Sequence, residues 1–211
     1  MVHAAADPLR PAARATQRHD RILDAAAACF AASGFHRTTM QEVAAKAGMS
    51  PGNLYRYFPS KDALIAGMVE RDRTEVAQAF AAASGDDLLG GLRALGRRTF
   101  LEDPRDKSTM CVQIWAEATR DPAILALHQG FEQELATRFL ALFEAHKAKG
   151  ALPASLNSAA AVRIITKLAN GLFVRRAAGA DFNPEQEVAE VFAVIEALLN
   201  GTIALPDSPS A

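Results

Sequence analysis

The spacing of apolar residues along the chain predicts helices over most of its length. Ile22, Leu23, Ala26 and Phe30 recur at the intervals that place side chains on one face of a helix, which predicts a helix over residues 17–33. Similar apolar stripes return in later segments, out to about residue 200. Alanine and leucine, both strong helix formers, dominate the composition, so we expect an all-α fold of about nine helices.

Residues 38–61 have a pattern of their own, which predicts two short helices joined by a tight turn. Thr39 followed three residues later by Glu42 is a capping box, so the first helix should start directly after Thr39. Gly48 suits the end of this helix, because glycine accepts the left-handed backbone conformation of a C-cap. Ser50, a favourable N-cap followed by a proline, should then begin the second helix.

The second short helix, over residues 51–58, spans barely two turns and cannot persist alone in water. Leu54 and Phe58 lie four residues apart, and we expect them to anchor this helix to a core. Lys61 begins the next helix, where a cation opposes the helix dipole. A bound phosphate would remove this conflict, whereas the plainer interpretation is a solvated lysine.

This stretch resembles the DNA-binding domain of the TetR family of bacterial transcriptional regulators. The similarity extends from about Arg18 to Glu70, and it rests on I-L-D-A-A-A-A-C-F-A-A-S-G-F-H-R-T-T-M (22–40), V-A-A-K-A-G-M-S-P-G-N-L-Y-R-Y-F (43–58) and P-S-K-D-A-L (59–64). It implies an N-terminal helix-turn-helix domain, followed by a more variable helical domain that binds an effector and dimerises.

On this basis the chain divides into two domains with flanking tails. We expect the helix-turn-helix domain at 17–62 and the effector-binding and dimerisation domain at 63–201, with a helix over 61–83 linking the two. Residues 1–16 and 202–211 are expected to be disordered. Arg10 and Arg14 in the first tail either reach DNA as a flexible arm or serve only to keep the chain soluble.

The resemblance implies that the helix over 51–58 enters the major groove of double-stranded DNA. Asn53 is the best candidate for a base contact, because its amide can pair bidentately with adenine. Tyr55 and Tyr57 would contact the DNA backbone, or would pack half-buried with their hydroxyls in water. The expected DNA-binding residues are Thr39, Gln41, Ser50, Pro51, Gly52, Asn53, Tyr55, Tyr57 and Lys61.

The resemblance also implies a pocket for a small organic effector of unknown identity in the second domain. A mixture of aromatic and polar residues would suit such a ligand, although each residue could instead belong to the core or the surface. The expected lining residues are Phe100, Gln113, Trp115, Glu117, His128, Phe131, Phe139 and Phe173.

The last two helices, over 157–178 and 184–200, are expected to form a four-helix bundle with their copies in a twofold homodimer. Ordinary packing within one chain is the alternative. A dimer could read two half-sites about 34–36 Å apart. The expected interface residues are Ile164, Leu168, Gly171, Leu172, Arg175, Val188, Val191, Phe192, Ile195 and Leu199.

The net charge of −1 hides an uneven distribution that suits a DNA-binding head. Residues 1–73 hold ten Lys/Arg against seven Asp/Glu, and residues 74–211 hold thirteen against seventeen. The helix-turn-helix therefore lies in the basic part of the chain, where a positive charge favours DNA.

The two cysteines, Cys29 and Cys111, lack the spacing of a metal site and suit a reducing compartment, so we expect a cytoplasmic protein without a cofactor. We see no leader peptide and no apolar run long enough to cross a membrane.

We therefore expect a ligand-responsive repressor rather than an enzyme. One alternative is a TetR-type fold with an architectural or protein-interaction role. The other is a helical-bundle enzyme that uses a metal or cofactor, but the chain lacks the Glu-x-x-His motifs of di-iron bundles, and His128 with Glu132 would supply only two ligands.

Overall fold

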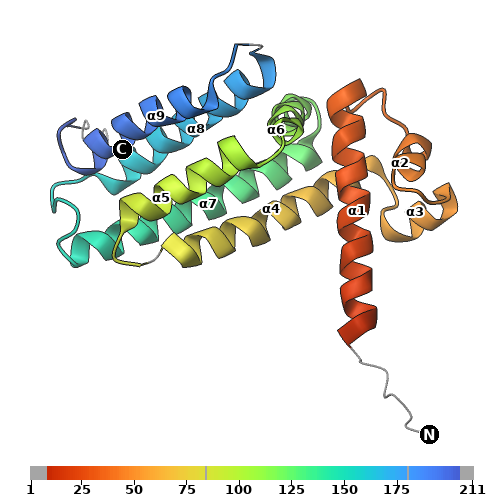
Figure 1. Ribbon diagram of the computed structural model, residues 1–211, viewed down its shortest axis with the longest axis horizontal. Helices are drawn as coiled ribbons and strands as arrows, with labels where there is room; N and C mark the ends of the chain where they lie inside the picture. The colour runs from red at the N-terminus through yellow and green to blue at the C-terminus, as the bar shows by residue number, and fades with distance from the viewer. Residues whose placement is uncertain (1–8, 84, 180, 205–211) are drawn as a thin grey trace, which may run out of the picture. The chain divides into compact units, whose positions relative to one another are not determined.

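The computed structural model describes residues 9–83, 85–179 and 181–204, and every regular element within these ranges is helical (Figure 1). The expected all-α fold is thus confirmed. The chain forms two compact units, which divide between Met68 and Val69. The described residues contain no helix that is both long enough and apolar enough to cross a membrane.

The first unit is built on a long helix and two short ones. The elements are α1 (Leu9–Ser33), α2 (Met40–Lys46), α3 (Pro51–Tyr57) and the first turns of α4 (Lys61–Ala83). Helix α2 packs against both α1 and α3. The predicted stripe of α1 is buried, and Leu54 and Phe58 anchor α3 as expected, because both side chains are almost completely buried.

The first helix begins earlier than the sequence pattern indicates. Residues 9–16 are helical in α1, so the expectation of a disordered stretch over 1–16 is wrong for these residues. Their alanines and arginines favour a helix once the buried turns of α1 provide a nucleus. Residues 1–8 lie outside the described residues.

The second unit is a bundle of six helices, among them the rest of α4. The others are α5 (Leu88–Arg97), α6 (Arg105–Ala118), α7 (Pro122–Ala148), α8 (Ser158–Ala178) and α9 (Pro184–Leu199). Within the bundle α6 packs against α7 and α8, and α9 packs against α5 and α8 (Figure 1). Phe139, Phe143 and Leu199 lie in its main core cluster.

A π-helical turn, η1 (Arg98–Glu102), continues α5, and α6 then starts at Arg105. Arg176 of α8 fixes this corner: its buried guanidinium donates to the carbonyl oxygens of Thr99 and Asp103. The connection between η1 and α6 is therefore only two residues long, because long-range hydrogen bonds hold the chain on both sides of Pro104.

The end of α9 is also more ordered than expected. Gly201 adopts φ +79°, and the amide of Ile203 donates to the carbonyl of Ala197 at 2.9 Å. The amide of Thr202 donates to the side chain of Asn200. These bonds terminate the helix in a defined turn, so the expected disorder is wrong for residues 202–204. Residues 205–211 lie outside the described residues.

Candidate nucleic-acid interface and internal cavity

Helix α2 starts at a complete capping box. The amide of Glu42 donates to Thr39 Oγ1 at 3.2 Å, and the amide of Thr39 donates to Glu42 Oε2 at 2.7 Å. This second bond lowers the pKa of the Glu42 carboxyl, because it stabilises the charged form. At the other end of α2, Gly48 takes φ +69° and allows the tight turn into α3.

Helix α3 starts at Ser50, whose side chain accepts a hydrogen bond from the amide of Asn53 at 3.3 Å. Leu54 points into the core, which leaves the opposite side of the helix exposed. Tyr55 is 45% exposed, and Gly52 is also exposed, whereas Asn53 is half-buried. The turn therefore presents small and polar groups at the start of a short helix, which is where a recognition helix meets base edges.

Several expected phosphate contacts already have partners within the unit. The hydroxyl of Thr39 donates to Glu42 Oε2 at 3.0 Å, and the hydroxyl of Tyr57 accepts from Arg18 Nη1 at 3.3 Å. Lys61 Nζ donates to the carbonyl oxygens of Phe35 and His36 at 2.7 and 3.2 Å. An ammonium group has three donors, so Lys61 retains one for a phosphate.

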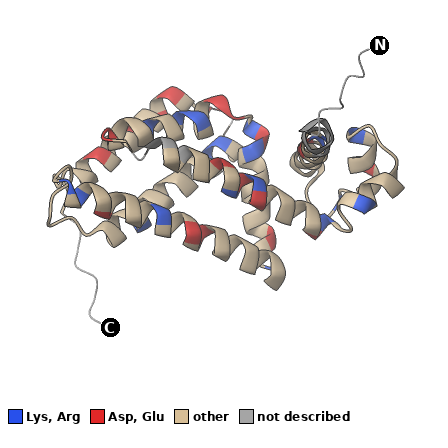
Figure 2. Cartoon of the chain, turned by 90° about the horizontal axis from the view of Figure 1, so that it is seen from below, with Lys and Arg blue, Asp and Glu red and all other residues tan. Residues whose placement is uncertain are grey.

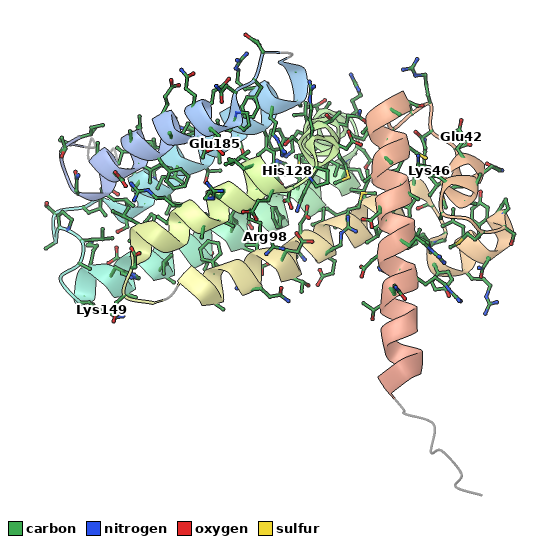
Figure 3. All side chains as sticks on the ribbon, in the orientation of Figure 1. Glu42, Lys46, Arg98, His128, Lys149 and Glu185 are labelled. Carbon is green, nitrogen blue, oxygen red and sulfur yellow. The ribbon has the colours of Figure 1, made fainter. Side chains whose placement is uncertain are left out.

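The remaining DNA-binding candidates, Gln41 and Pro51, are exposed. Glu42 and Lys46 are on α2, where Figure 3 labels them.

The second unit contains a cavity of about 220 Å³, whose wall is mostly apolar. Its aromatic side includes a continuous series of rings. The centroids of Phe100 and Phe173 are 4.9 Å apart, those of Phe173 and Trp115 are 5.8 Å apart, and those of Trp115 and His128 are 6.1 Å apart. Such a cavity has the character of a small-molecule site.

Most of the expected effector residues line this cavity: Phe100, Trp115, His128, Phe131, Phe139 and Phe173. Gln113 and Glu117 do not, and this corrects the expectation for both. Helix α6 presents Lys107, Cys111 and Trp115 to the cavity at intervals of four residues. Gln113 and Glu117 are each two residues away from that stripe, roughly 160° around the helix.

The sequence pattern did not reveal the charged end of the cavity. Lys107 Nζ lies 3.4 Å from Asp72 Oδ1, 2.9 Å from Glu75 Oε2 and 3.1 Å from Asp103 Oδ2. The three carboxylates raise the pKa of Lys107 above its ordinary value, despite the opposing effect of burial. All four residues line the cavity, together with Arg98, which Figure 3 labels in the bundle.

Cys111 lines the same region, and burial raises the pKa of its thiol to about 12. The thiol therefore stays neutral, which makes it a poor nucleophile. Within the part of the chain that the structure describes, no three His, Cys, Asp or Glu side chains are grouped as they would be around a metal ion.

One glycine brings α5 close to α9 at the cavity wall. A Cβ atom at Gly96 would overlap the ring of Phe192, and both residues line the cavity. The absence of a side chain at Gly96 therefore defines the position of the Phe192 ring.

The expected dimer residues separate into two groups. Leu172, Val188, Ile195 and Leu199 are buried within their own chain, so for these four the alternative of core packing holds. Apolar spacing on a helix cannot by itself distinguish a core from an interface. The others are partly or fully exposed: Ile164, Leu168, Gly171, Arg175, Val191 and Phe192.

Comparison with known proteins gives one match within each of the two compact units of the structure. Residues 22–68 match the family of tetR-type bacterial regulatory proteins, and residues 90–200 match the C-terminal part of BetI-type transcriptional repressors. Among curated relatives, the transcriptional regulator UidR of Escherichia coli K12 is 28% identical over 72% of this chain and 78% of its own length. The regulator BetI of Yersinia pestis Pestoides F is 26% identical over 87% of this chain and 93% of its own.

Solved structures give the same result. GusR of Salmonella enterica has a TM-score of 0.68 at 26% identity, covering 93% of this chain and 99% of its own. The fatty acid degradation regulator FadR of Bacillus halodurans shares the fold with a TM-score of 0.73 at 18% identity, covering 87% and 95%. These matches are regulators rather than enzymes, and they agree with the helix-turn-helix geometry. The chain belongs to the TetR family of bacterial transcriptional regulators.

Proposed function

We propose that the protein is a homodimeric repressor that binds a palindromic DNA operator and releases it when a small organic effector enters the cavity. The observation that carries this proposal is the α2–α3 motif, in which Leu54 anchors a short helix whose opposite side is exposed. The repressor name of the matching C-terminal family supports the direction of regulation.

Asn53 and Gln41 are the side chains we assign to base recognition, since amides make bidentate contacts in the major groove. Ser50 and Lys61 are assigned to phosphates. Figure 2 shows basic and acidic residues interleaved along the helices. The basic excess lies in residues 1–73, which include the first unit, and it favours that unit as the one that contacts DNA.

For the dimer we propose the outer faces of α8 and α9, without the four expected interface residues that are buried within their own chain, Leu172, Val188, Ile195 and Leu199. Val174 is 47% exposed and Val194 is 39% exposed, although both are apolar. Gly171, Ala189 and Ala193 are exposed too, and their small size allows two helices to approach closely. Burial of this surface against a second copy would remove it from water.

Helix α4 supplies a route from the effector to the DNA-binding unit. Its first turns carry Leu64 and Ile65, which are buried in the core of the first unit. Its later turns carry Asp72 and Glu75, which line the cavity. An effector that displaces these later turns would move the whole helix, and this displacement is the proposed signal for release.

The test is a selection of fragmented genomic DNA by the purified protein, followed by sequencing. The proposal expects a short palindrome whose half-sites are about one helical turn apart. Compounds that release this DNA would then identify the effector. Enrichment of many dispersed sites without a palindrome would instead favour an architectural role, and an operator that no compound releases would refute ligand control.

A further inference from the structure

The cavity wall indicates the chemical class of the effector, provided that the proposed function is correct in assigning the effector to this cavity. Its aromatic rings, Phe100, Phe173, Trp115, Phe131 and Phe139, form a surface suited to a hydrocarbon or aromatic body. The charged side chains in the wall determine what kind of polar group that body can carry.

The largest group of charges in the wall is already balanced. Lys107 Nζ lies within ion-pair distance of three carboxylates, those of Asp72, Glu75 and Asp103, and donates a hydrogen bond to Glu75. Arg98 Nη2 lies 3.6 Å from Glu75 Oε2, and Arg71 acts on the same acids from outside the wall. Each of these three acids therefore has the ammonium of Lys107 nearby, and Glu75 also has Arg98, so a ligand cation is less needed here than at an acid without such a partner.

Glu132 is the fourth carboxylate of the wall and differs from the other three. Its ion-pair partner among the described residues is His128, whose Nε2 lies 3.7 Å from Glu132 Oε1. That distance exceeds a normal hydrogen bond. No lysine or arginine of the described residues lies within 4.0 Å of the Glu132 carboxylate, although the side chain is only 39% exposed. Glu132 is therefore the one carboxylate of the wall that has a histidine, rather than a lysine or arginine, as its ion-pair partner among the described residues.

We propose that the effector carries a protonated amine, which donates hydrogen bonds to the carboxylate of Glu132, while its apolar body lies against the rings of Trp115, Phe131 and Phe173. A carboxylate partner strengthens a hydrogen bond from an ammonium group, and the faces of nearby rings attract the same cation. An anionic effector would instead meet the negative charge of Glu132 and be repelled.

The chain provides its own reporter for this test. Trp115 is the only tryptophan in the sequence, and it lines the cavity. Titrations without DNA at pH 7 would follow its fluorescence with benzylamine, benzyl alcohol and benzoate, which share one ring and differ in the charge of the head group. We expect benzylamine to bind about tenfold more tightly than benzyl alcohol, and benzoate to bind most weakly.

Glu132→Gln removes the charge and preserves the shape of the side chain. We expect this variant to bind benzylamine and benzyl alcohol about equally. The matched control is Glu134→Gln, the same substitution two residues further along α7, because Glu134 lies outside the wall and pairs with Arg138 at 2.7 Å. The control should keep the preference for the amine.

Three results would overturn the proposal: equal binding of amine and alcohol by the unmodified protein, an undiminished amine preference in Glu132→Gln, or no response of Trp115 to any of the probes. The regulatory proposal fails separately. If benzylamine binding depends on Glu132 but no amine releases operator DNA, the cavity recognises amines as proposed, and the proposed release of DNA by an effector is wrong. If a neutral or anionic compound releases DNA from this cavity, the function stands and the amine proposal is wrong.

Discussion

At the scale of single residues, Lys61 makes contacts within the first unit that its position in the sequence did not suggest. Its ammonium group links the start of α4 to the carbonyls of Phe35 and His36, and it lies 4.5 Å from the centroid of the Phe35 ring. These contacts offset the cost of placing a cation at a helix N-terminus. The same group has a third N–H donor beyond these two bonds, and the proposed phosphate contact would use it.

Lys61→Ala should therefore affect both folding and DNA binding. We expect a loss of about 1 kcal/mol in the free energy of unfolding, because two carbonyls lose a charged donor, which urea unfolding can measure. Under conditions where the variant stays folded, DNA affinity should fall about equally for all sequences, and the salt dependence should weaken. A changed base preference would contradict the assignment of Lys61 to phosphate.

Asn53→Ala should have the opposite signature. We expect it to relax the sequence preference at one position of each half-site by about 1–3 kcal/mol, while binding to unrelated DNA changes little. Selection from a library of randomised operators would show the loss as a flattened position in the consensus. An unchanged consensus would move the base contact to another side chain, such as Gln41.

At the scale of elements, the capping box of α2 predicts a response to acid. The pKa of Glu42 is lowered in the folded state by the bond from the Thr39 amide. Its contribution is therefore complete above the unfolded pKa of about 4.3, and it is lost as the pH falls through the lower folded value. Hydrogen exchange should show the first turn of α2 opening more readily at pH 3 than at pH 6.

Glu42→Gln is the control for that experiment, because it removes the ionisable group. This variant should show reduced protection of α2 already at pH 6, with little further loss at pH 3 beyond that of the other helices. Equal pH dependence in both proteins would show that another group opens the helix.

The corner between α5 and α6 depends on Arg176, and its replacement should be costly. Arg176→Met keeps an unbranched chain but leaves the carbonyls of Thr99 and Asp103 without their donor. We expect the second unit to lose roughly 2–4 kcal/mol of unfolding free energy, measured by urea unfolding. Arg105→Met, which removes an exposed side chain at the same corner, should cost less. Equal losses would contradict the importance of burial here.

The sequence predicted elements well where their signals are local. Thr39 and Ser50 each mark a helix start, because the side chain of each accepts a hydrogen bond from the backbone amide three residues further on. The π-turn and the start of α6 at Arg105 depend instead on Arg176, about seventy residues further along the chain. No local pattern could have indicated them.

The difference between local signals and contacts between distant residues also applies to the cavity. The family resemblance implied a pocket and aromatic residues to line it, but nothing in the sequence distinguished Asp72, Glu75 and Lys107 from the solvated residues of ordinary helix surfaces. Only the fold brings α4 and α6 together around the ammonium of Lys107. Likewise, apolar spacing on α8 and α9 did not reveal which side chains are buried within the single chain and which remain exposed for a dimer interface.

At the scale of the whole molecule, the proposed dimer makes a sharp prediction. Val174→Asp should convert the protein to monomers, because it places a charge in an apolar interface, and DNA affinity should fall by more than tenfold, roughly the contribution of one half-site. Leu125→Asp is the matched control, since Leu125 is also an exposed apolar residue but lies on α7. Sedimentation equilibrium would distinguish the two, and a Val174→Asp dimer would require another interface.

The close approach at Gly96 has a consequence for how such a regulator can change. Since any side chain there collides with the ring of Phe192, a single added methyl group would force that ring to move at the cavity wall. If the ring moved into the cavity, it would occupy part of the space proposed for the effector. Gly96→Ala requires only one nucleotide change, and it could thus hold the proposed regulator in a single state that no longer responds to an effector.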